Sequence, residues 1–238
     1  MTTIDPDATV GSLVLDHPAL APLLERLELD FCCHGDVPLA AACAEHGLDV
    51  DTTVRLLAAQ AAAGGSEPAH AFDARSATAA ELCAHIVSEH HDRLRSELPR
   101  LEETAATVVR VHGGDDPRLA HLAATLDRLA ADVLAHVERE EMRLFPCCVA
   151  VEGGGAIDDD ALLDELEHDH ADVGEGLREL RELADGYAPE TARCGTHRSL
   201  LSGLAELERD LHLHIHEENN VLFPRVRSRL TAAKGAAQ

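Results

Sequence analysis

Aromatic residues are scarce in this sequence, and their scarcity indicates which secondary structure to expect. They make up 2% of the 238 residues, with no Trp, one Tyr and four Phe, whereas Ala and Leu dominate. This composition favours helices over sheets. No stretch approaches the roughly 20 uncharged apolar residues that a membrane-spanning helix needs, and residues 1–10 lack the basic start and apolar run of a signal peptide. We therefore expect a soluble, cytoplasmic, all-α protein.

Basic residues are also few. The 20 Lys and Arg residues stand against 44 Asp and Glu, which gives a formal net charge of −24. Such a surface repels the phosphates of nucleic acids and the headgroups of anionic lipids. Nucleic acid and membrane are therefore not expected as partners. Part of this charge would disappear if some of the carboxylates ligate metal.

Cysteine patterns typical of disulfide frameworks or zinc sites are missing. The seven cysteines are odd in number and irregularly spaced, and no C-x-x-C occurs among them. In a cytosolic chain they are expected to be thiols. Histidine, by contrast, is abundant, with 16 residues. The positions of the histidines are therefore the most informative feature of the sequence.

Clusters of Gly, Asp, Pro and Ser divide the chain into parts. The stretch GGSEPAHAFDARSAT has little periodicity and predicts a linker. Three later clusters (HGGDDP, EGGGAIDDD and DGYAP) separate four long helical patterns, which predict an antiparallel four-helix bundle. The predicted parts are a small helical domain at 1–63, a linker at 64–77, the bundle at 78–230 and a tail at 231–238. The bundle helices are expected near 78–111, 116–150, 159–184 and 189–230.

The second and fourth predicted helices of the bundle share a pattern. Each contains H-x-x-x-E followed by L-F-P, and the two copies are offset by 78 residues. Apolar residues precede each copy at helical spacing, so the His and the Glu interrupt a stripe that faces inward. The matched stripes are Leu129, Val133, His136, Glu140 and Leu144, and Leu207, Leu211, His214, Glu218 and Leu222.

The first and third predicted helices repeat as well, at an offset of 79 residues. Each places one histidine, His91 or His170, in an apolar stripe. The chain is therefore a duplicated helical hairpin in which each copy supplies two His and one Glu. The matched stripes are Val87, His91, Leu94, Leu98 and Leu101, and Leu166, His170, Val173, Leu177 and Leu180.

Six polar residues in a bundle core favour a metal site over isolated buried histidines. A buried carboxylate is costly unless it is paired, and these stripes contain no Lys or Arg. His and Glu donors suit first-row metals such as iron, although they also suit manganese. If each of two irons takes two His and one oxygen from each bridging Glu, a solvent-derived oxo bridge would leave about one position open for O2, NO or peroxide. The predicted ligands are His91, His136, Glu140, His170, His214 and Glu218.

Other histidines compete for these roles. Glu167-x-x-His170 resembles the ferritin-like motif, but Ser88 stands where the first helix would need its Glu. His212 and His216 have no counterpart in the second helix, so we expect them to be solvated or to lie next to the ligands without binding the metal. His168 is close in sequence to His170, and the repeat alignment favours His170.

The sequence is similar to a known family. The segment 30–35 (DFCCHG), with Ala40-Ala41 and Leu48-Asp49 after it, resembles the small N-terminal domain of the Repair of Iron Centres proteins. These are bacterial di-iron proteins associated with iron–sulfur clusters damaged by nitric oxide or oxidants. The rest of the chain resembles their haemerythrin-like domain. The matching stretches there are HDR from His91, H-x-x-x-EE-x-x-LFP from His136, EHDH from Glu167 with Gly174-Glu175, and H-x-x-x-ENNVLFPR from His214.

The resemblance implies the same six ligands, two non-haem irons and a role in repairing damaged iron–sulfur proteins. It leaves iron donation and NO reduction open as mechanisms, so an NO reductase-type activity remains undecided. The alternative is a haemerythrin-like protein that binds or senses O2 or NO without turnover. The adjacent Cys32 and Cys33 suit metal transfer or thiol chemistry, whereas Cys147-Cys148 has no counterpart in the other repeat. Whether the small domain mediates a homodimer stays open.

Overall fold

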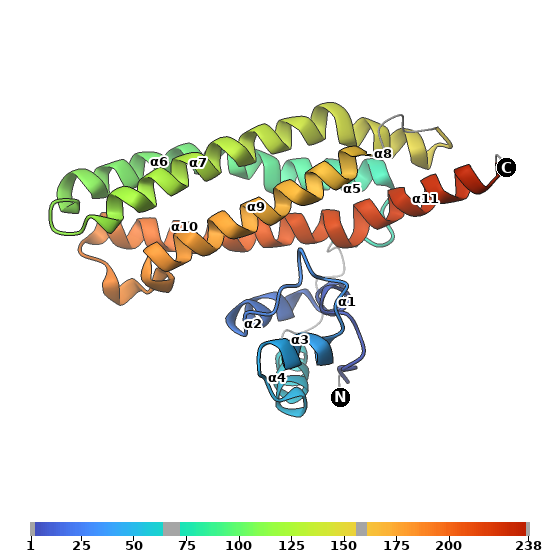
Figure 1. Ribbon diagram of the computed structural model, residues 1–238, viewed down its shortest axis with the longest axis horizontal. Helices are drawn as coiled ribbons and strands as arrows, with labels where there is room; N and C mark the ends of the chain where they lie inside the picture. The colour runs from blue at the N-terminus through green and yellow to red at the C-terminus, as the bar shows by residue number, and fades with distance from the viewer. Residues whose placement is uncertain (1–2, 64–71, 156–160, 237–238) are drawn as a thin grey trace. The chain divides into compact units, whose positions relative to one another are not determined.

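The computed structural model describes residues 3–63, 72–155 and 161–236 (Figure 1). Within these ranges every regular element is a helix, which confirms the predicted all-α class. Residues 64–71 of the predicted linker, 156–160 of a predicted break and 237–238 of the predicted tail lie outside the described residues. Contacts divide the chain into two units, residues 79–211 and residues 1–78 together with 212–238.

The unit formed by residues 79–211 consists of long helices that lie side by side (Figure 1). Amphipathic stripes explain this packing, because the leucines of each stripe are buried, and burial of each contributes about 1.5–3 kcal/mol. Its elements are α5 (Ala79–Ile86), η2 (Val87–His91), α6 (Asp92–His112), α7 (Arg118–Arg139), η3 (Glu140–Leu144), α8 (Phe145–Glu152), α9 (Ala161–Leu183), η4 (Asp185–Tyr187), η5 (Pro189–Thr191) and most of α10 (Gly195–Glu217).

Three short segments of the long helices are π-helical, namely η2, η3 and a later segment, η6 (Glu218–Leu222). Two of them end at the Leu of the L-F-P motif, with Pro146 and Pro224 as the second residues of the next helices. Proline has no amide hydrogen, and its ring clashes with the carbonyl four residues earlier. The wider π turn, with i to i+5 bonds, accommodates both effects. The repeated Pro thus explains why both copies of the motif widen at the same place.

The last helix of the predicted bundle begins later than the sequence indicated, at Gly195 rather than near residue 189. The intervening turn contains three consecutive residues with positive φ, Asp185, Gly186 and Tyr187, which an α-helix cannot accommodate. Tyr187 is buried there, with the Arg181 guanidinium 5.6 Å from its ring centroid. These tertiary contacts stabilise a turn that helix propensity alone does not predict.

The other unit contains the short helices expected for a small domain. They are α1 (Val10–Asp16), η1 (Pro18–Leu20), α2 (Ala21–Arg26), α3 (Leu39–Glu45) and α4 (Val50–Ala63). Leu20, Leu24, Phe31, Leu39 and Leu57 form its buried core. The same unit includes the last residues of α10, then η6 and α11 (Phe223–Ala236), which continues into the stretch predicted as a tail.

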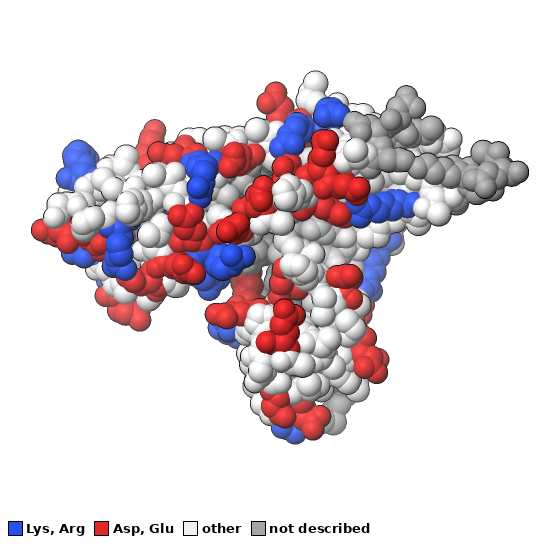
Figure 2. Space-filling view, viewed as in Figure 1, with Lys and Arg blue, Asp and Glu red and all other residues white. Residues whose placement is uncertain are grey.

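The surface reflects the acidic composition. Figure 2 shows Asp and Glu side chains over much of the visible face, with fewer Lys and Arg among them. Within the described ranges, none of the helices is both long enough and apolar enough to cross a membrane.

Candidate metal centre

Four of the six predicted ligands lie in the unit formed by residues 79–211, on four helical segments. His91 ends the π segment η2, His136 is in the last turn of α7, Glu140 begins η3 and His170 is in α9. All four are at most 3% exposed. Glu140 Oε2 lies 3.4 Å from His91 Nε2, whereas its Oε1 lies 3.1 Å from His136 Nε2 and 3.9 Å from His170 Nε2. The two oxygens of one carboxylate therefore face different histidines.

The ring nitrogens His136 Nε2 and His170 Nε2 are only 2.9 Å apart. Two neutral imidazoles approach this closely when one donates a proton to the other or when both direct lone pairs at one cation. Donors at right angles around a first-row ion, each about 2.1 Å from it, are separated by about 3 Å. The spacing of these two nitrogens thus fits two ligands of one metal ion.

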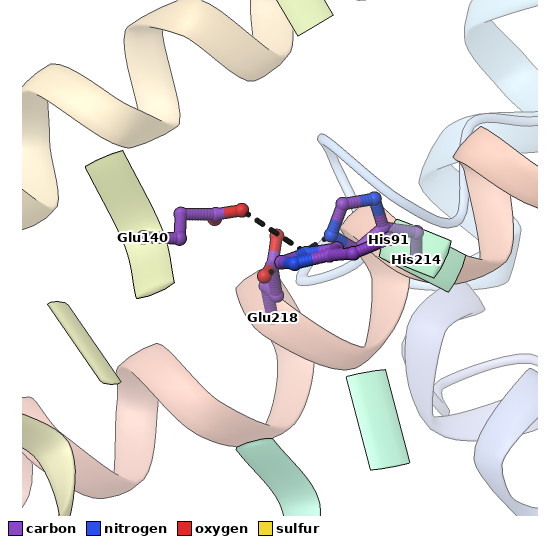
Figure 3. Close-up of side chains that lie close together, drawn as sticks. All are labelled: His91, Glu140, His214 and Glu218. Atoms are coloured by element: carbon purple, nitrogen blue, oxygen red, sulfur yellow. Dashed lines mark ion pairs between the residues drawn. The ribbon is translucent and has the colours of Figure 1, made fainter. Parts of the chain in front are cut away.

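The other two predicted ligands lie at the end of α10 and the start of η6. His214 Nε2 is 3.2 Å from Glu218 Oε1, and the two residues are 1% and 0% exposed. The six residues supply two groups of ligand atoms, each with all its atoms within 4.8 Å of one another. Figure 3 shows the first group, with both carboxylates directed at the same place as the imidazoles. The groups share both glutamates: His91, Glu140, His214 and Glu218 form one, and His136, Glu140, His170 and Glu218 the other.

The electrostatic environment keeps Glu140 ionised. Complete burial would by itself raise the pKa of this carboxyl group, but the imidazoles of His136, His170 and His91 outweigh burial and hold the pKa well below its usual range. A buried carboxylate is tolerated only with a positive partner. This stabilisation needs positively charged imidazoles, so imidazoles that act as neutral metal ligands would need cations beside the two buried glutamates to replace that charge.

Two carboxylates accept hydrogen bonds from the Nδ1 atoms of His91 and His136. His91 Nδ1 donates to Glu141 Oε1 at 2.8 Å, and Glu141 in turn accepts from Arg95. His136 Nδ1 donates to Asp169 Oδ2 at 3.2 Å, and Asp169 is 2.8 Å from an arginine guanidinium. Such bonds fix the tautomer in which Nε2 has a lone pair for a metal. Sequence reasoning did not assign roles to Glu141 and Asp169, although each adjoins a predicted ligand in the chain.

The aromatic residue of the first L-F-P motif also contacts a predicted ligand. The Phe145 ring stacks on His91 with centroids 5.5 Å apart and an interplanar angle of 15°. Phe145 is buried. Its contact excludes solvent from one face of the imidazole and restricts the ring orientation.

The competing histidines occupy different environments. His168 is exposed, so the structure places His170, and not His168, beside His136. Of the two environments expected for His216, solvent or a place next to the ligands, burial excludes the first: it is 2% exposed and donates from Nδ1 to the Phe31 carbonyl at 3.0 Å. Burial lowers the pKa of His216 to about 4, so this imidazole is neutral. The sequence pattern missed this residue because its contact comes from a segment 185 residues away.

All seven cysteines are thiols. Cys32 and Cys33 lie in the unit that contains the small domain, and neither belongs to the two donor groups of the candidate centre. Cys32 is buried, and Cys33 is half-buried. Cys147 and Cys148 lie in α8, just after the first L-F-P motif.

Comparisons with known proteins cover both parts of the chain. Residues 82–226 match the haemerythrin HHE cation binding domain, and residues 6–61 match a domain of unknown function, DUF542. The chain is 39% identical over 219 residues to the iron–sulfur cluster repair protein YtfE of Edwardsiella ictaluri, covering 92% of this chain and 96% of that protein. Proteins of the same name from Pectobacterium atrosepticum and Dickeya chrysanthemi are 36% and 34% identical, with the same coverage.

Proposed function

Because the chain belongs to the haemerythrin-domain family of the YtfE iron–sulfur cluster repair proteins, we propose that it restores iron–sulfur centres damaged by nitrosative or oxidative stress. The observation that carries the proposal is the pair of donor groups that share both buried glutamates. Two groups with common carboxylates suit a pair of adjacent cations better than they suit a single cation. The partners would be damaged iron–sulfur proteins in the cytoplasm, a compartment in which all seven cysteines would stay reduced.

The two irons would each have two histidines and share both glutamates. His91 and His214 would serve one iron, and His136 and His170 the other, with Glu140 and Glu218 common to both. Nitrogen and oxygen donors of this kind suit non-haem iron. A solvent-derived oxo bridge would complete the proposed centre. When bound, the irons supply either transferable metal or one electron each.

The protein's own residues position the donors and limit the access of water. Glu141 and Asp169 hold the Nδ1 atoms of His91 and His136, so that Nε2 of each ring is directed at Glu140. Phe145 covers one face of His91. Outer partners of this kind typically change metal affinity by 10–100-fold when they are removed. Iron release for repair would therefore depend on how firmly these bonds hold the ligands.

Two experiments separate the mechanisms. Iron donation predicts that the iron-loaded protein restores clusters when it is mixed with an apo-ferredoxin, sulfide and reductant, whereas a variant without the ligands does not. NO reduction predicts that the diferrous protein under anaerobic NO releases N2O, since two NO, two electrons and two protons give N2O and water. Uptake of NO without N2O or cluster recovery would instead support the alternative, a haemerythrin-like protein that binds or senses O2 or NO. A protein that neither restores clusters, nor releases N2O, nor takes up NO would contradict the proposal.

A further inference from the structure

A further group of metal-binding side chains lies in the loop after α2, within the unit that contains the small domain. Ligand atoms of Asp30, Cys32 and Cys33 all lie within 4.8 Å of one another. The two sulfur atoms are 3.7 Å apart, and Cys32 Sγ is 3.3 Å from Asp30 Oδ1. One carboxylate and two thiols thus converge at a single point.

The loop that carries this group is held on two sides. Asp30 Oδ1 accepts hydrogen bonds from the backbone amides of Cys32 and Cys33 at 2.9 and 2.8 Å. The Cys32 carbonyl accepts from the side-chain amides of Asn219 and Asn220 at 3.2 and 3.1 Å. The turn formed by Asp30 explains the bonds to the amides, but it does not require both sulfurs to lie near the same carboxylate. The convergence of the three side chains is therefore an additional feature of the loop.

The group has one basic neighbour, because His34 Nδ1 lies 2.7 Å from Asp30 Oδ2 and this hydrogen bond raises the pKa of the imidazole. Burial would raise the pKa of Asp30, but hydrogen bonds from His34, Cys33 and Cys32 lower it overall, so the carboxylate is ionised. The hydrogen bond with Cys33, together with burial, raises the pKa of the Cys32 thiol well above its usual value. A divalent cation would favour ionisation of both thiols, because thiolates rather than thiols are the metal ligands.

We propose that Asp30, Cys32 and Cys33 form a second metal site, which binds one divalent cation through one carboxylate oxygen and two thiolates. Two sulfur donors and one oxygen suit a borderline first-row ion such as Fe²⁺, Co²⁺ or Zn²⁺. The two thiol protons pass to solvent as the thiolates bind. Three protein donors leave one tetrahedral position open. Solvent reaches the group beside Asp30 and His34, whose side chains are 38% and 74% exposed, whereas Cys32 is buried.

The loop that carries Asp30, Cys32 and Cys33 lies close in the structure to a predicted iron ligand of the bundle. Asn219, which bonds the Cys32 carbonyl, directly follows Glu218 in the π segment η6. The loop therefore lies against the turn that carries a predicted iron ligand. An open thiolate site there suits a metal ion that is exchanged, rather than one held permanently. The assignment of Fe²⁺ as the natural occupant rests on the proposed function, whereas the existence of the site does not.

The chain offers a matched control for the test, because Cys147 and Cys148 are a second adjacent pair. Co²⁺ is added anaerobically to reduced protein whose bundle has first been loaded with iron, and thiolate-to-cobalt charge-transfer absorption is recorded. The wild type and Cys147→Ser/Cys148→Ser are expected to develop this absorption, and Cys32→Ser/Cys33→Ser is not. Asp30→Asn, which can still accept the two backbone bonds, is expected to bind Co²⁺ at least tenfold more weakly.

A wild type without thiolate absorption would overturn the site, as would full absorption in Cys32→Ser/Cys33→Ser or undiminished affinity in Asp30→Asn. Circular dichroism checks that each variant is folded, and Asp30→Asn decides the matter if the serine variant is not. A further variant, Glu218→Ala, separates the two proposals. Retained cobalt absorption without bundle iron would support an independent site, and its loss would contradict one. Failure of cluster recovery would affect only the assignment of Fe²⁺.

Discussion

The two copies of the H-x-x-x-E and L-F-P motif have the same backbone but different surroundings. Both place the glutamate at the start of a π segment and the proline after it. In the first copy the next residue, Glu141, bonds a histidine of the candidate centre. In the second copy the equivalent residue, Asn219, bonds the cysteine loop instead. The repeated positions thus carry the predicted ligands, and the positions beside them determine what each turn contacts.

The residue after these two differs even more between the copies. Met142 is 73% exposed, whereas its counterpart Asn220 donates to the carbonyls of Phe31 and Cys32 at 3.3 and 3.1 Å. Duplication of a hairpin therefore preserved the inward face of both helices. The outward face of one copy acquired a role in holding the small domain's loop.

The largest effect on stability is expected where the loop approaches Asn220 most closely. A Cβ atom added at Gly35 would overlap Asn220 Oδ1 and lie 2.6 Å from the Phe31 carbonyl. Gly35→Ala should lower the free energy of unfolding by about 3 kcal/mol, because overpacking forces backbone shifts. Urea denaturation measures this. The control Gly174→Ala, at a helical glycine with open space around it, should instead raise stability by about 0.5 kcal/mol. Equal effects of the two variants would refute this account of the loop.

Exchanging the residues of the two copies tests the comparison directly. Asn220→Met should lower the free energy of unfolding by about 2 kcal/mol, because the hydrogen bonds from Asn220 to two carbonyls are lost, although each carbonyl keeps a second donor. The reciprocal change Met142→Asn should alter it by less than about 0.5 kcal/mol, since this side chain is mostly exposed. Thermal or urea unfolding provides both values. The comparison fails if Met142→Asn proves the more damaging change.

A smaller effect is expected for the acidic partner in the first copy. Glu141→Gln removes the negative charge that orients His91, and it should weaken iron binding about tenfold with little change in fold. Competition with a chelator measures the affinity. Glu138→Gln, an exposed residue on the same helix, is the matched control and should bind iron as the wild type does. Identical affinities in the two variants would show that Glu141 does not position its histidine.

Periodicity predicted much of the fold and the burial of the candidate ligands, because both depend on local helix geometry. The stripes around His136 and His214 are buried as expected, and all six predicted ligands lie in two donor groups. The bonds made by Glu141, His216 and Asn220 could not be predicted, since their partners are distant in the chain. The π turns were not predicted, because the search for apolar residues assumed a regular period of about 3.6 residues, which does not include a widened turn.

Iron analysis of purified protein, together with two ligand variants and a control, tests the central claim most directly. The shared-glutamate arrangement predicts about two irons per chain in the wild type and in Glu138→Ala, and large losses in both Glu140→Ala and Glu218→Ala. Each glutamate belongs to both donor groups, so loss of either one should affect both irons. Full iron content in either ligand variant, or a wild type that binds no iron, would contradict the account.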